Sequence, residues 1–385
     1  MQSLFSQRPN RELLSEKTAA FILFAIWVCC LLIFIRFIEP PRMSDQMRYF
    51  MDAADPENIG VGVRDFRIGL IFPLHLFMKV FGYSELSFYF LPFLAFAGTA
   101  SVIYLLGRFY FNDLTGLFAA YLFCTTPAVL REVSELLPDY FSAMLIGFAV
   151  LLMATATRAD SENDISEAKL LALFACSGLL LGWAYLAREF ATLIYPILGI
   201  AMVLLKVRVK HIFALSAGAL LMLGVELLWN LYHYDDPLTR IRYVVFTRRE
   251  LLTSPYFSSL AYETNFWPAF LQFFNIGSER SLMNGWLFML GLGSLAVLAL
   301  SAPRRYAYLV VWGLTSWALL TTIAIIPTFG GEMILRLHKF RYWAIVLPPL
   351  YIAVAATLCL GPSKLVQAFA KRSRTIQQAS IKVES

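Results

Sequence analysis

The apolar segment TAAFILFAIWVCCLLIFIRFI (18–38) decides the fold class of this chain. A helix needs roughly 20 apolar residues to cross the hydrocarbon core of a bilayer, and this segment provides them. It is too long for a cleaved signal peptide, and it runs into Arg36, Glu39, Pro40 and Pro41 rather than into a small-residue cleavage site. We therefore predict that it forms the first membrane-spanning helix.

Further stretches along the chain have the same length and hydropathy, although some reach them only narrowly. With the first segment, the predicted spans are 18–38, 86–107, 114–131, 139–157, 170–187, 190–205, 212–231, 282–301, 306–326 and 342–361. The segment 68–81 is also apolar, but Pro73, His75 and Lys79 interrupt it, so we expect an interfacial helix there. The predicted fold is an all-α polytopic membrane protein with about ten transmembrane helices.

The composition supports a membrane protein and excludes several other classes. Of the 385 residues, 59% are hydrophobic and 15% are charged, whereas a soluble domain has about 25% charged residues. The excess of 32 basic over 26 acidic side chains is explained by loops facing anionic lipid, without a nucleic-acid partner. The five cysteines lie in apolar runs and the four histidines are scattered, so neither a disulfide framework nor a metal site is predicted.

The distribution of basic residues predicts the orientation in the membrane. An even number of spans places both termini on one side, and the short connections 206–210 and 302–305 are rich in Lys and Arg, which is typical of cytoplasmic loops. The predicted organisation is a cytoplasmic N-terminus (1–17), a transmembrane catalytic domain (18–361) and a basic cytoplasmic tail (362–385). Two long loops, 36–85 and 232–281, then lie on the extracytoplasmic face with much of the polar chemistry.

The first outer loop contains the leading candidates for chemistry. Asp45 and Arg48 are three residues apart, so they share one face of a helix that also includes Tyr49. A carboxylate in this position can take a proton from an acceptor hydroxyl, while the simpler alternative is a solvated salt bridge. Further on, Arg64 and Arg67 would lie at headgroup depth, where arginines bind a lipid phosphate or simply extend their charge to water.

Later outer segments also combine acids with cations. Glu135 and Asp139 lie at the start of the fourth span. An acid in this position can also cap the helix and interact favourably with its dipole. Arg188 and Glu189 form the turn between the fifth and sixth spans, where they could be either a hairpin salt bridge or part of a polar cavity.

A basic and aromatic cluster precedes the last span. It consists of Arg336, His338, Lys339, Arg341, Tyr342 and Trp343. The aromatic pair is typical of an interfacial belt, but so many cations are disfavoured outside the membrane. Binding of an anion such as a phosphate or pyrophosphate explains them better.

No nucleotide-binding or hydrolase motif is present. The sequence lacks a Walker loop, a G-x-G-x-x-G after a strand, a Ser-His-Asp order and an H-E-x-x-H. The inner loops are also too short for a nucleotide-binding domain. Donation of a sugar from a nucleotide is therefore not predicted, and no cofactor is indicated.

The order of these segments resembles the GT-C superfamily of protein O-mannosyltransferases and aminoarabinose transferases. The matching segments are Asp45-Gln46-Met47-Arg48-Tyr49, Arg67 with Pro73, Phe81-Gly82-Tyr83-Ser84, Asp139, Gly178 to Gly182 leading to Arg188, Tyr234-Asp235-Asp236-Pro237-Leu238 and Arg341-Tyr342. The resemblance covers residues 17–360. Gln46 stands where a second acid is common, which disfavours a metal held by an acidic pair, and Asp235 replaces a glycine.

The resemblance implies a glycosyltransferase that uses a polyprenyl-phosphate sugar and inverts the anomeric carbon. Asp45 would be the catalytic base, and Asp139 would position the acceptor or share that role. Arg48, Arg67, Arg188 and Arg341 would hold the lipid phosphate. The further substrate contacts would be Tyr49, Arg64, Glu135, Glu189, Arg336, Lys339 and Tyr342. The implied partners are the lipid-linked donor, membrane lipids and an acceptor lipid, glycan or protein.

Other functional classes stay open from the sequence. A polymerase or ligase of lipid-linked glycans would also need arginine-rich outer loops, and 232–281 would suit it. A transporter or flippase would place ionisable residues within the spans, where Glu226 is the nearest example and lies close to a span end. A structural subunit would leave the outer acids and arginines without a role.

Overall fold

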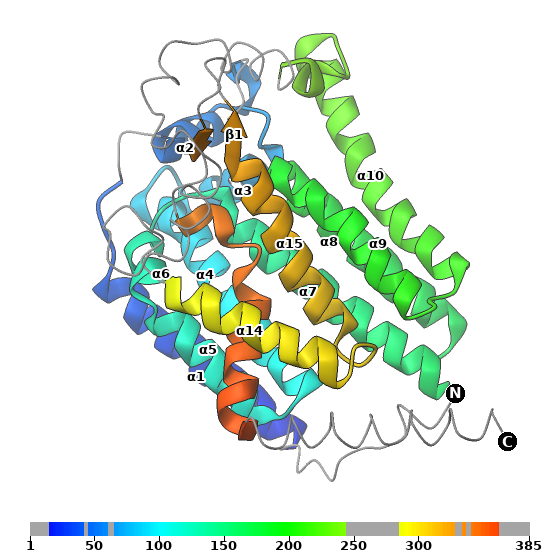
Figure 1. The fold of residues 1–385 in the computed structure, drawn as a ribbon. Coiled ribbons are helices and arrows are strands. Elements are labelled where there is room, and N and C mark those ends of the chain that lie inside the picture. Colours follow the sequence, from blue (N-terminus) through cyan, green and yellow to red (C-terminus); the bar gives the residue numbers. More distant parts are fainter. Residues whose placement is uncertain are drawn as a thin grey trace, which may run out of the picture.

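The computed structural model describes residues 15–41, 45–60, 65–243, 285–327, 333–335 and 340–361. Its elements in order are α1 (Glu16–Arg36), α2 (Asp45–Ala54), η2 (Pro56–Asn58), α3 (Ile68–Phe81), α4 (Glu85–Tyr110), α5 (Asp113–Thr125), α6 (Pro127–Glu132), α7 (Pro138–Glu162), α8 (Glu167–Ala187), η3 (Glu189–Leu193), α9 (Ile194–Leu204), α10 (Val209–Tyr234), α14 (Gly285–Ser301), α15 (Ala307–Ala324), β1 (Ile325–Pro327), β2 (Met333–Leu335) and η5 (Phe340–Trp343). A final helix covers Leu347–Gly361 (Figure 1).

The protein is a multi-pass helical membrane protein, as predicted. Five helices, α1, α4, α7, α8 and α10, are long and apolar enough to cross a bilayer. Each of the other predicted spans coincides with a shorter apolar helix, so the helical pattern is confirmed while the number of crossings stays a prediction. The pair β1 and β2 adds a short antiparallel ladder, in which Ile326 faces Ile334, to the predicted all-α fold.

Local sequence signals fix where several helices begin and end. The side chains of Ser15 and Asn112 accept hydrogen bonds from the first turns of α1 and α5, which satisfies exposed backbone donors. The segment 68–81 forms α3 despite Pro73, and Gly82 ends it with a φ of 73° that favours glycine. Asp235, which replaces the glycine of the resembling turn, has a φ of 54° in the same left-handed region.

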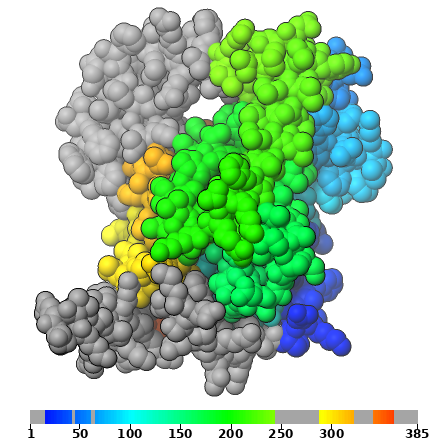
Figure 2. Space-filling view, turned by 90° about the vertical axis from the view of Figure 1, so that its right-hand side faces the viewer, coloured from blue at the N-terminus to red at the C-terminus, as the bar shows by residue number. Residues whose placement is uncertain are grey.

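Helices α8 and α10 approach each other more closely than side chains normally permit. A Cβ atom at Gly178 of α8 would overlap the Leu215 carbonyl oxygen of α10. A Cβ atom at Gly218 of α10 would likewise overlap the Ala175 carbonyl oxygen of α8. The glycines therefore set the distance between the two helices, which form the face that Figure 2 shows.

The polar elements divide between the two ends of the bundle. α2, the start of α3, α6, η3 and η5 gather at one end, which we call the loop end (Figure 1). The start of α1 and the end of the final helix lie at the opposite end. There, Arg208 forms ion pairs with Asp160 and Glu167 and joins the ends of α7, α8 and α10. The described parts of several segments predicted to lie outside the membrane are thus brought together at the loop end.

Candidate functional site

A group of buried and half-buried charged side chains lies at the loop end, and we call it the charged cluster. It consists of Arg67, Arg188, Arg240, Arg341, Glu135, Asp139, Glu189 and Glu226. Its members come from α3, α7, α8, α10 and the segments beside them, although they are distant in sequence. Isolated charges are strongly disfavoured away from water, so each must be paired where it is buried.

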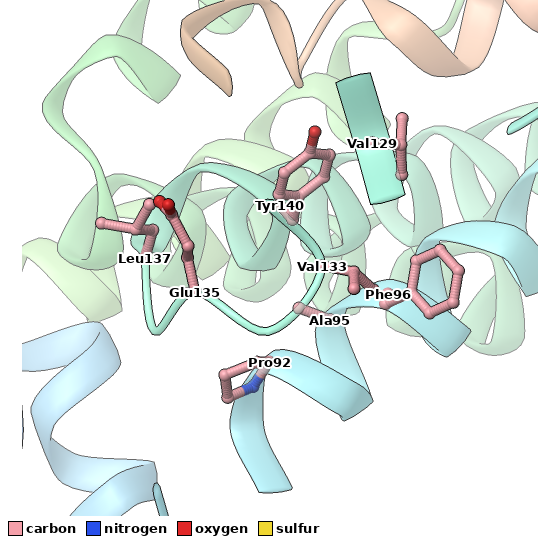
Figure 3. Close-up of a pocket in the computed structure, with 8 residues that line it drawn as sticks. All are labelled: Pro92, Ala95, Phe96, Val129, Val133, Glu135, Leu137 and Tyr140. Carbon is pink, nitrogen blue, oxygen red and sulfur yellow. The ribbon is translucent and has the colours of Figure 1, made fainter. Parts of the chain in front are cut away.

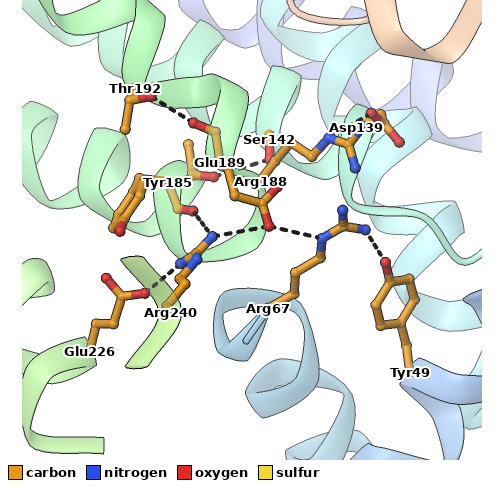
Figure 4. Close-up of polar contacts among 11 residues, drawn as sticks. Tyr49, Arg67, Asp139, Ser142, Tyr185, Arg188, Glu189, Thr192, Glu226 and Arg240 are labelled. Carbon is orange, nitrogen blue, oxygen red and sulfur yellow. Dashed lines mark hydrogen bonds and ion pairs between the residues drawn. The ribbon is translucent and has the colours of Figure 1, made fainter. Parts of the chain in front are cut away.

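Glu189 lies at the centre of one half of the charged cluster. Its Oε1 atom is 3.4 Å from Arg67 Nε and 3.4 Å from Arg240 Nη2. Figure 4 shows the two guanidinium groups approaching this carboxylate from opposite sides. Burial alone would raise the pKa of Glu189, but Arg67, Arg240 and Arg188 lower it to about 2, so the carboxylate stays charged.

Arg67 connects this half of the charged cluster to helix α2. Its Nη1 group donates a hydrogen bond to the Tyr49 hydroxyl, and its guanidinium lies 5.5 Å from the centre of the Tyr49 ring. Tyr49 is fully buried, and burial raises its pKa to about 12, so the phenol is neutral. Asp45, the predicted base, begins α2 one turn earlier and is half-buried. The structure thus places Asp45 next to the cluster through Tyr49.

Arg188 and Glu189 are neighbours in sequence but bind different partners. Arg188 Nε lies 3.1 Å from Asp139 Oδ1, and both side chains are buried. Leu137, not Asp139, occupies the N-cap position of α7, so capping does not explain this acid. The predicted residues Arg188 and Asp139 are therefore brought together, while Glu189 turns to Arg67 and Arg240.

Arg341 and Tyr342 complete the other half of the cluster. Arg341 Nη1 donates to Glu135 Oε2 over 3.2 Å. The guanidinium carbons of Arg188 and Arg341 each lie 5.3 Å from the centre of the Tyr342 ring. Within the described ranges, the buried Nε group of Arg341 has no hydrogen-bond partner, whereas that of Arg188 faces the Asp139 carboxylate. Arg341 therefore has a donor left for an anion.

Arg48, one of the predicted phosphate-binding residues, lies outside the charged cluster. Its Nε atom lies 3.1 Å from Asp52 and 3.2 Å from Asp65, and its side chain is 46% exposed. Burial, with help from Asp65, raises the pKa of Asp52 to about 6. The sequence interpretation of Asp45 and Arg48 as one pair missed these two carboxylates. Arg48 connects α2 to the chain before α3 instead, and its phosphate-binding role stays a prediction.

Three predicted substrate contacts lie outside the described residues, namely Arg64, Arg336 and Lys339. Most of the loop 232–281 also lies outside them.

Sequence reasoning missed Arg240 and did not assign Glu226 to the site. Glu226 is an acid within the mostly apolar α10, and from the sequence it was considered only for the transporter alternative. In the structure Arg240 Nη1 donates to Glu226 Oε1 over 2.6 Å. A buried acid in an apolar helix requires a cation nearby, and this signal could have directed attention to the basic residues just after α10.

Glu132, next to the charged cluster, is a further acid with a shifted pKa. It accepts a hydrogen bond from the Tyr140 hydroxyl, which lines a cavity of about 10 Å³ together with Glu135 and the apolar residues of α4 and α6 (Figure 3). Burial and the nearby Glu135 raise the pKa of Glu132 to about 8, although Arg341 opposes the shift. The Glu132 carboxyl is therefore mainly protonated at neutral pH.

Glu132→Gln should remove a pH-dependent loss of stability. A raised pKa in the folded state favours folding below the ordinary value of 4.5, and this contribution is lost as the pH rises through about 8. We expect the variant and the wild type to have similar Tm values at pH 5, and the variant to melt several degrees higher at pH 9. Thermal unfolding of the purified protein across this range measures the effect. Parallel pH profiles for the two proteins would contradict the assignment.

A metal centre is not apparent in the described part of the chain. Among those residues, no group of three or more His, Cys, Asp or Glu side chains is arranged to hold an ion. The sequence-based expectation that no metal is used stays a prediction.

An apolar groove lies between three of the helices that also carry or adjoin members of the charged cluster. It has a volume of about 530 Å³ and is formed by α3, α8 and α10, with Trp183 and Phe72 among its walls. Phe72 of α3 packs against Trp229 of α10 with ring centres 4.8 Å apart. The lining residues Ile68 and Val225 are the immediate sequence neighbours of Arg67 and Glu226. The groove is therefore next in sequence to two members of the charged cluster.

Comparisons with known proteins agree with this architecture. Residues 69–229 match the family described as dolichyl-phosphate-mannose-protein mannosyltransferase. The fold is similar to ArnT from Cupriavidus metallidurans, solved with undecaprenyl phosphate, with a TM-score of 0.61, 14% identity, and coverage of 93% of this chain and 62% of ArnT. It is also similar to the oligosaccharyltransferase AglB from Archaeoglobus fulgidus, solved with an inhibitory peptide and a dolichol-phosphate, with a TM-score of 0.55 and 14% identity.

The AglB match covers 92% of this chain but 52% of AglB, so the chain spans about half the length of that relative. No curated protein matches the sequence. The family match in the centre of the chain and the shared fold along most of its length agree with the order of motifs. The central part of the protein therefore matches the mannosyltransferase family, and the fold along most of the chain is similar to that of ArnT and AglB.

Proposed function

We propose that the protein is a membrane glycosyltransferase that transfers a sugar from a polyprenyl-phosphate donor to an acceptor hydroxyl. The observation that carries this proposal is an apolar groove next to a cluster of arginines, of which Arg341 has an unused hydrogen-bond donor. A lipid phosphate needs both surfaces, one for its chain and one for its headgroup. The cell membrane is the proposed location, with the loop end on the extracytoplasmic face and both termini in the cytoplasm.

The donor is proposed to place its first isoprene units in the groove and its phosphate beside Arg188 and Arg341. The groove wall is almost entirely apolar, so it offers a polyprenyl chain burial at roughly 25 cal/mol per Å². The groove residue Ile68 is the sequence neighbour of Arg67, a member of the charged cluster, which supports a phosphate site close to the groove. The lipid phosphates named for the ArnT and AglB structures are consistent with this ligand class.

The proposed reaction is a single displacement at the anomeric carbon. The acceptor hydroxyl oxygen forms the new glycosidic bond as the bond from the anomeric carbon to the phosphate oxygen breaks, so configuration is inverted. The hydroxyl proton passes to the Asp45 carboxylate, and the departing lipid phosphate gains the negative charge. Arg188 and Arg341 stabilise that charge as it develops.

The other carboxylates have supporting roles in this proposal. Asp139 is held 3.1 Å from Arg188, so it orients that guanidinium or a hydroxyl of the acceptor. Glu135 holds Arg341 in the same way over 3.2 Å. The acceptor is a lipid, glycan or protein with a free hydroxyl.

The direct test is sugar transfer by the purified protein in lipid nanodiscs. It is incubated with a panel of radiolabelled polyprenyl-phosphate sugars and with membrane lipids, glycans and protein acceptors. We expect label to move from at least one donor to an acceptor, with release of polyprenyl phosphate. Absence of transfer across the panel, with a folded protein that also fails to bind polyprenyl phosphate, would refute the proposal.

Replacing Arg341 tests the phosphate site. To avoid leaving a buried carboxylate unpaired, Arg341→Gln is combined with Glu135→Gln. We expect kcat/KM for transfer to fall by about 10²- to 10³-fold, because a donor to the developing charge is lost. Arg305→Gln is the matched control, since Arg305 also lies beside a tyrosine ring, but at the opposite end of the bundle. Equal activity of the two variants would exclude Arg341 from the site.

A further inference from the structure

A continuous chain of polar contacts crosses the loop end from α10 to α2. It runs from Glu226 to Arg240, then to Glu189, Arg67 and Tyr49. Figure 4 shows these side chains in one row, with Arg240 and Arg67 on either side of Glu189. The row begins on the helix that lines the apolar groove and ends on the helix that begins with Asp45.

We propose that Glu226 and Arg240 are positioning residues for the transfer reaction. Together they fix the position of the Glu189 carboxylate, which in turn fixes the Arg67 guanidinium. Arg67 then holds Tyr49 and so the helix that begins with Asp45. This inference rests on the proposed function, but one of its tests does not require activity. Neither residue is expected to touch the substrate.

The chain after α10 folds back to bring Arg240 to this place. α10 ends at Asp235 in the left-handed conformation, and Asp236 caps the next turn by accepting a hydrogen bond from Leu238 N over 3.0 Å. The Asn230 side chain donates to the Pro237 carbonyl oxygen over 3.2 Å and fixes the reversal to α10. Arg240 is consequently only 2% exposed.

Arg240 is held in one orientation. Nη1 donates to Glu226 Oε1 over 2.6 Å, and Nη2 donates to the Tyr185 carbonyl oxygen over 3.2 Å. Its guanidinium carbon lies 4.6 Å from the centre of the Tyr185 ring. With both ends of the planar group fixed, Nη2 faces Glu189 at a set distance of 3.4 Å. The planar guanidinium group of an arginine can make this set of contacts, whereas the single ammonium group of a lysine cannot.

Glu189 passes this constraint on to Arg67. Since the same Oε1 atom faces both arginines, a shift of Arg240 shifts the partner of Arg67. Arg67 then donates to Tyr49, which is one helical turn from Asp45. Mispositioning by about 1 Å is enough to cost roughly 100-fold in rate, so a remote contact of this kind can control catalysis.

Stability alone does not account for the pair of Glu226 and Arg240. Replacing a buried ion pair with apolar side chains of similar volume is often neutral or stabilising. A merely structural pair would therefore be replaceable, whereas a positioning pair would not. This difference gives the experiment its discriminating power.

The first test is the double variant Glu226→Leu/Arg240→Met in nanodiscs. We expect it to fold with a Tm no lower than the wild type, while kcat falls about 100-fold and KM for the donor changes little, because Arg188 and Arg341 still hold the phosphate. Arg240→Lys should not restore kcat. The matched control is Arg108→Met/Asp113→Leu, which removes an ion pair of 3.1 Å at the opposite end. Wild-type kcat in the Glu226→Leu/Arg240→Met protein would overturn the proposal.

The second test uses thermal unfolding and needs no activity. Glu226→Gln and Tyr49→Phe are made singly and together, since the row of contacts joins these residues in the described part of the chain. We expect their Tm shifts to be clearly non-additive, whereas independent sites add. Additive shifts would overturn the proposal even if the double variant lost activity. If the wild type transfers no sugar but the shifts are non-additive, the proposed function fails and the positioning row stands.

Discussion

Asp45→Asn should reduce sugar transfer by at least about 100-fold while the protein folds normally, because the substitution removes the proposed proton acceptor. The amide has the shape of the carboxylate but cannot take the proton from the acceptor hydroxyl. Loss of a negative charge in the first turn of α2 costs only about 0.3–1 kcal/mol, so a change in stability cannot explain so large a loss. Initial rates and Tm values are measured on the same preparations.

Glu57→Gln is the control for this variant. Glu57 is an exposed acid in the first turn of η2, in the same loop and with the same relation to a helix start. It should retain wild-type activity. If Asp45→Asn retains more than about a tenth of the wild-type rate, Asp45 is not the base, and Asp139 becomes the residue to test.

Gly178→Ala should separate α8 from α10 and greatly destabilise the protein. A single added methyl would overlap the backbone of the facing helix at Leu215, where a flexible side chain cannot simply move away. Overpacking in a tight interface typically costs 1–3 kcal/mol, and a clash with backbone is at the upper end. Transfer should fall with it, since Glu189 follows α8 directly and Glu226 lies on α10. Yield, Tm and transfer rate are the measurements.

Gly224→Ala provides the comparison on α10 itself. No atom lies within 4 Å of a Cβ built at Gly224, so the added methyl has free space there and should improve helix propensity slightly. We expect unchanged or slightly higher stability. A Gly178→Ala protein as stable as Gly224→Ala would mean that the close approach of the helices is not required.

Much of the helical pattern followed from hydropathy because each span must satisfy its own backbone in lipid. The predicted spans 86–107 and 139–157 correspond to α4 and α7 within a few residues. The gathering of Arg67, Asp139 and Arg188 was also predictable, since all three were expected just outside span ends on one side of the membrane. Topology alone brings such residues to the same end of a bundle.

The pairing of the charges could not be predicted in the same way. Arg48 was expected to act with Asp45, but the fold of the chain between α2 and α3 brings Asp65 to within 3.2 Å of it. Arg240 was overlooked because its place depends on a chain reversal at Asp235 and Asp236, not on any span. Pairing is set by side-chain directions and loop conformations, which hydropathy does not encode.

The net charge of the charged cluster has a consequence for how a lipid-linked sugar donor would reach the site. Its four arginines face four carboxylates, so within the described part of the chain the cluster as a whole is close to electrically neutral. A neutral site exerts little long-range attraction on anions, and electrostatic steering through water would contribute little to capture. Encounter would instead occur by lateral diffusion within the bilayer, through the groove between α3 and α10. The rate of capture should then follow the surface density of the lipid in the membrane and vary little with the ionic strength of the buffer.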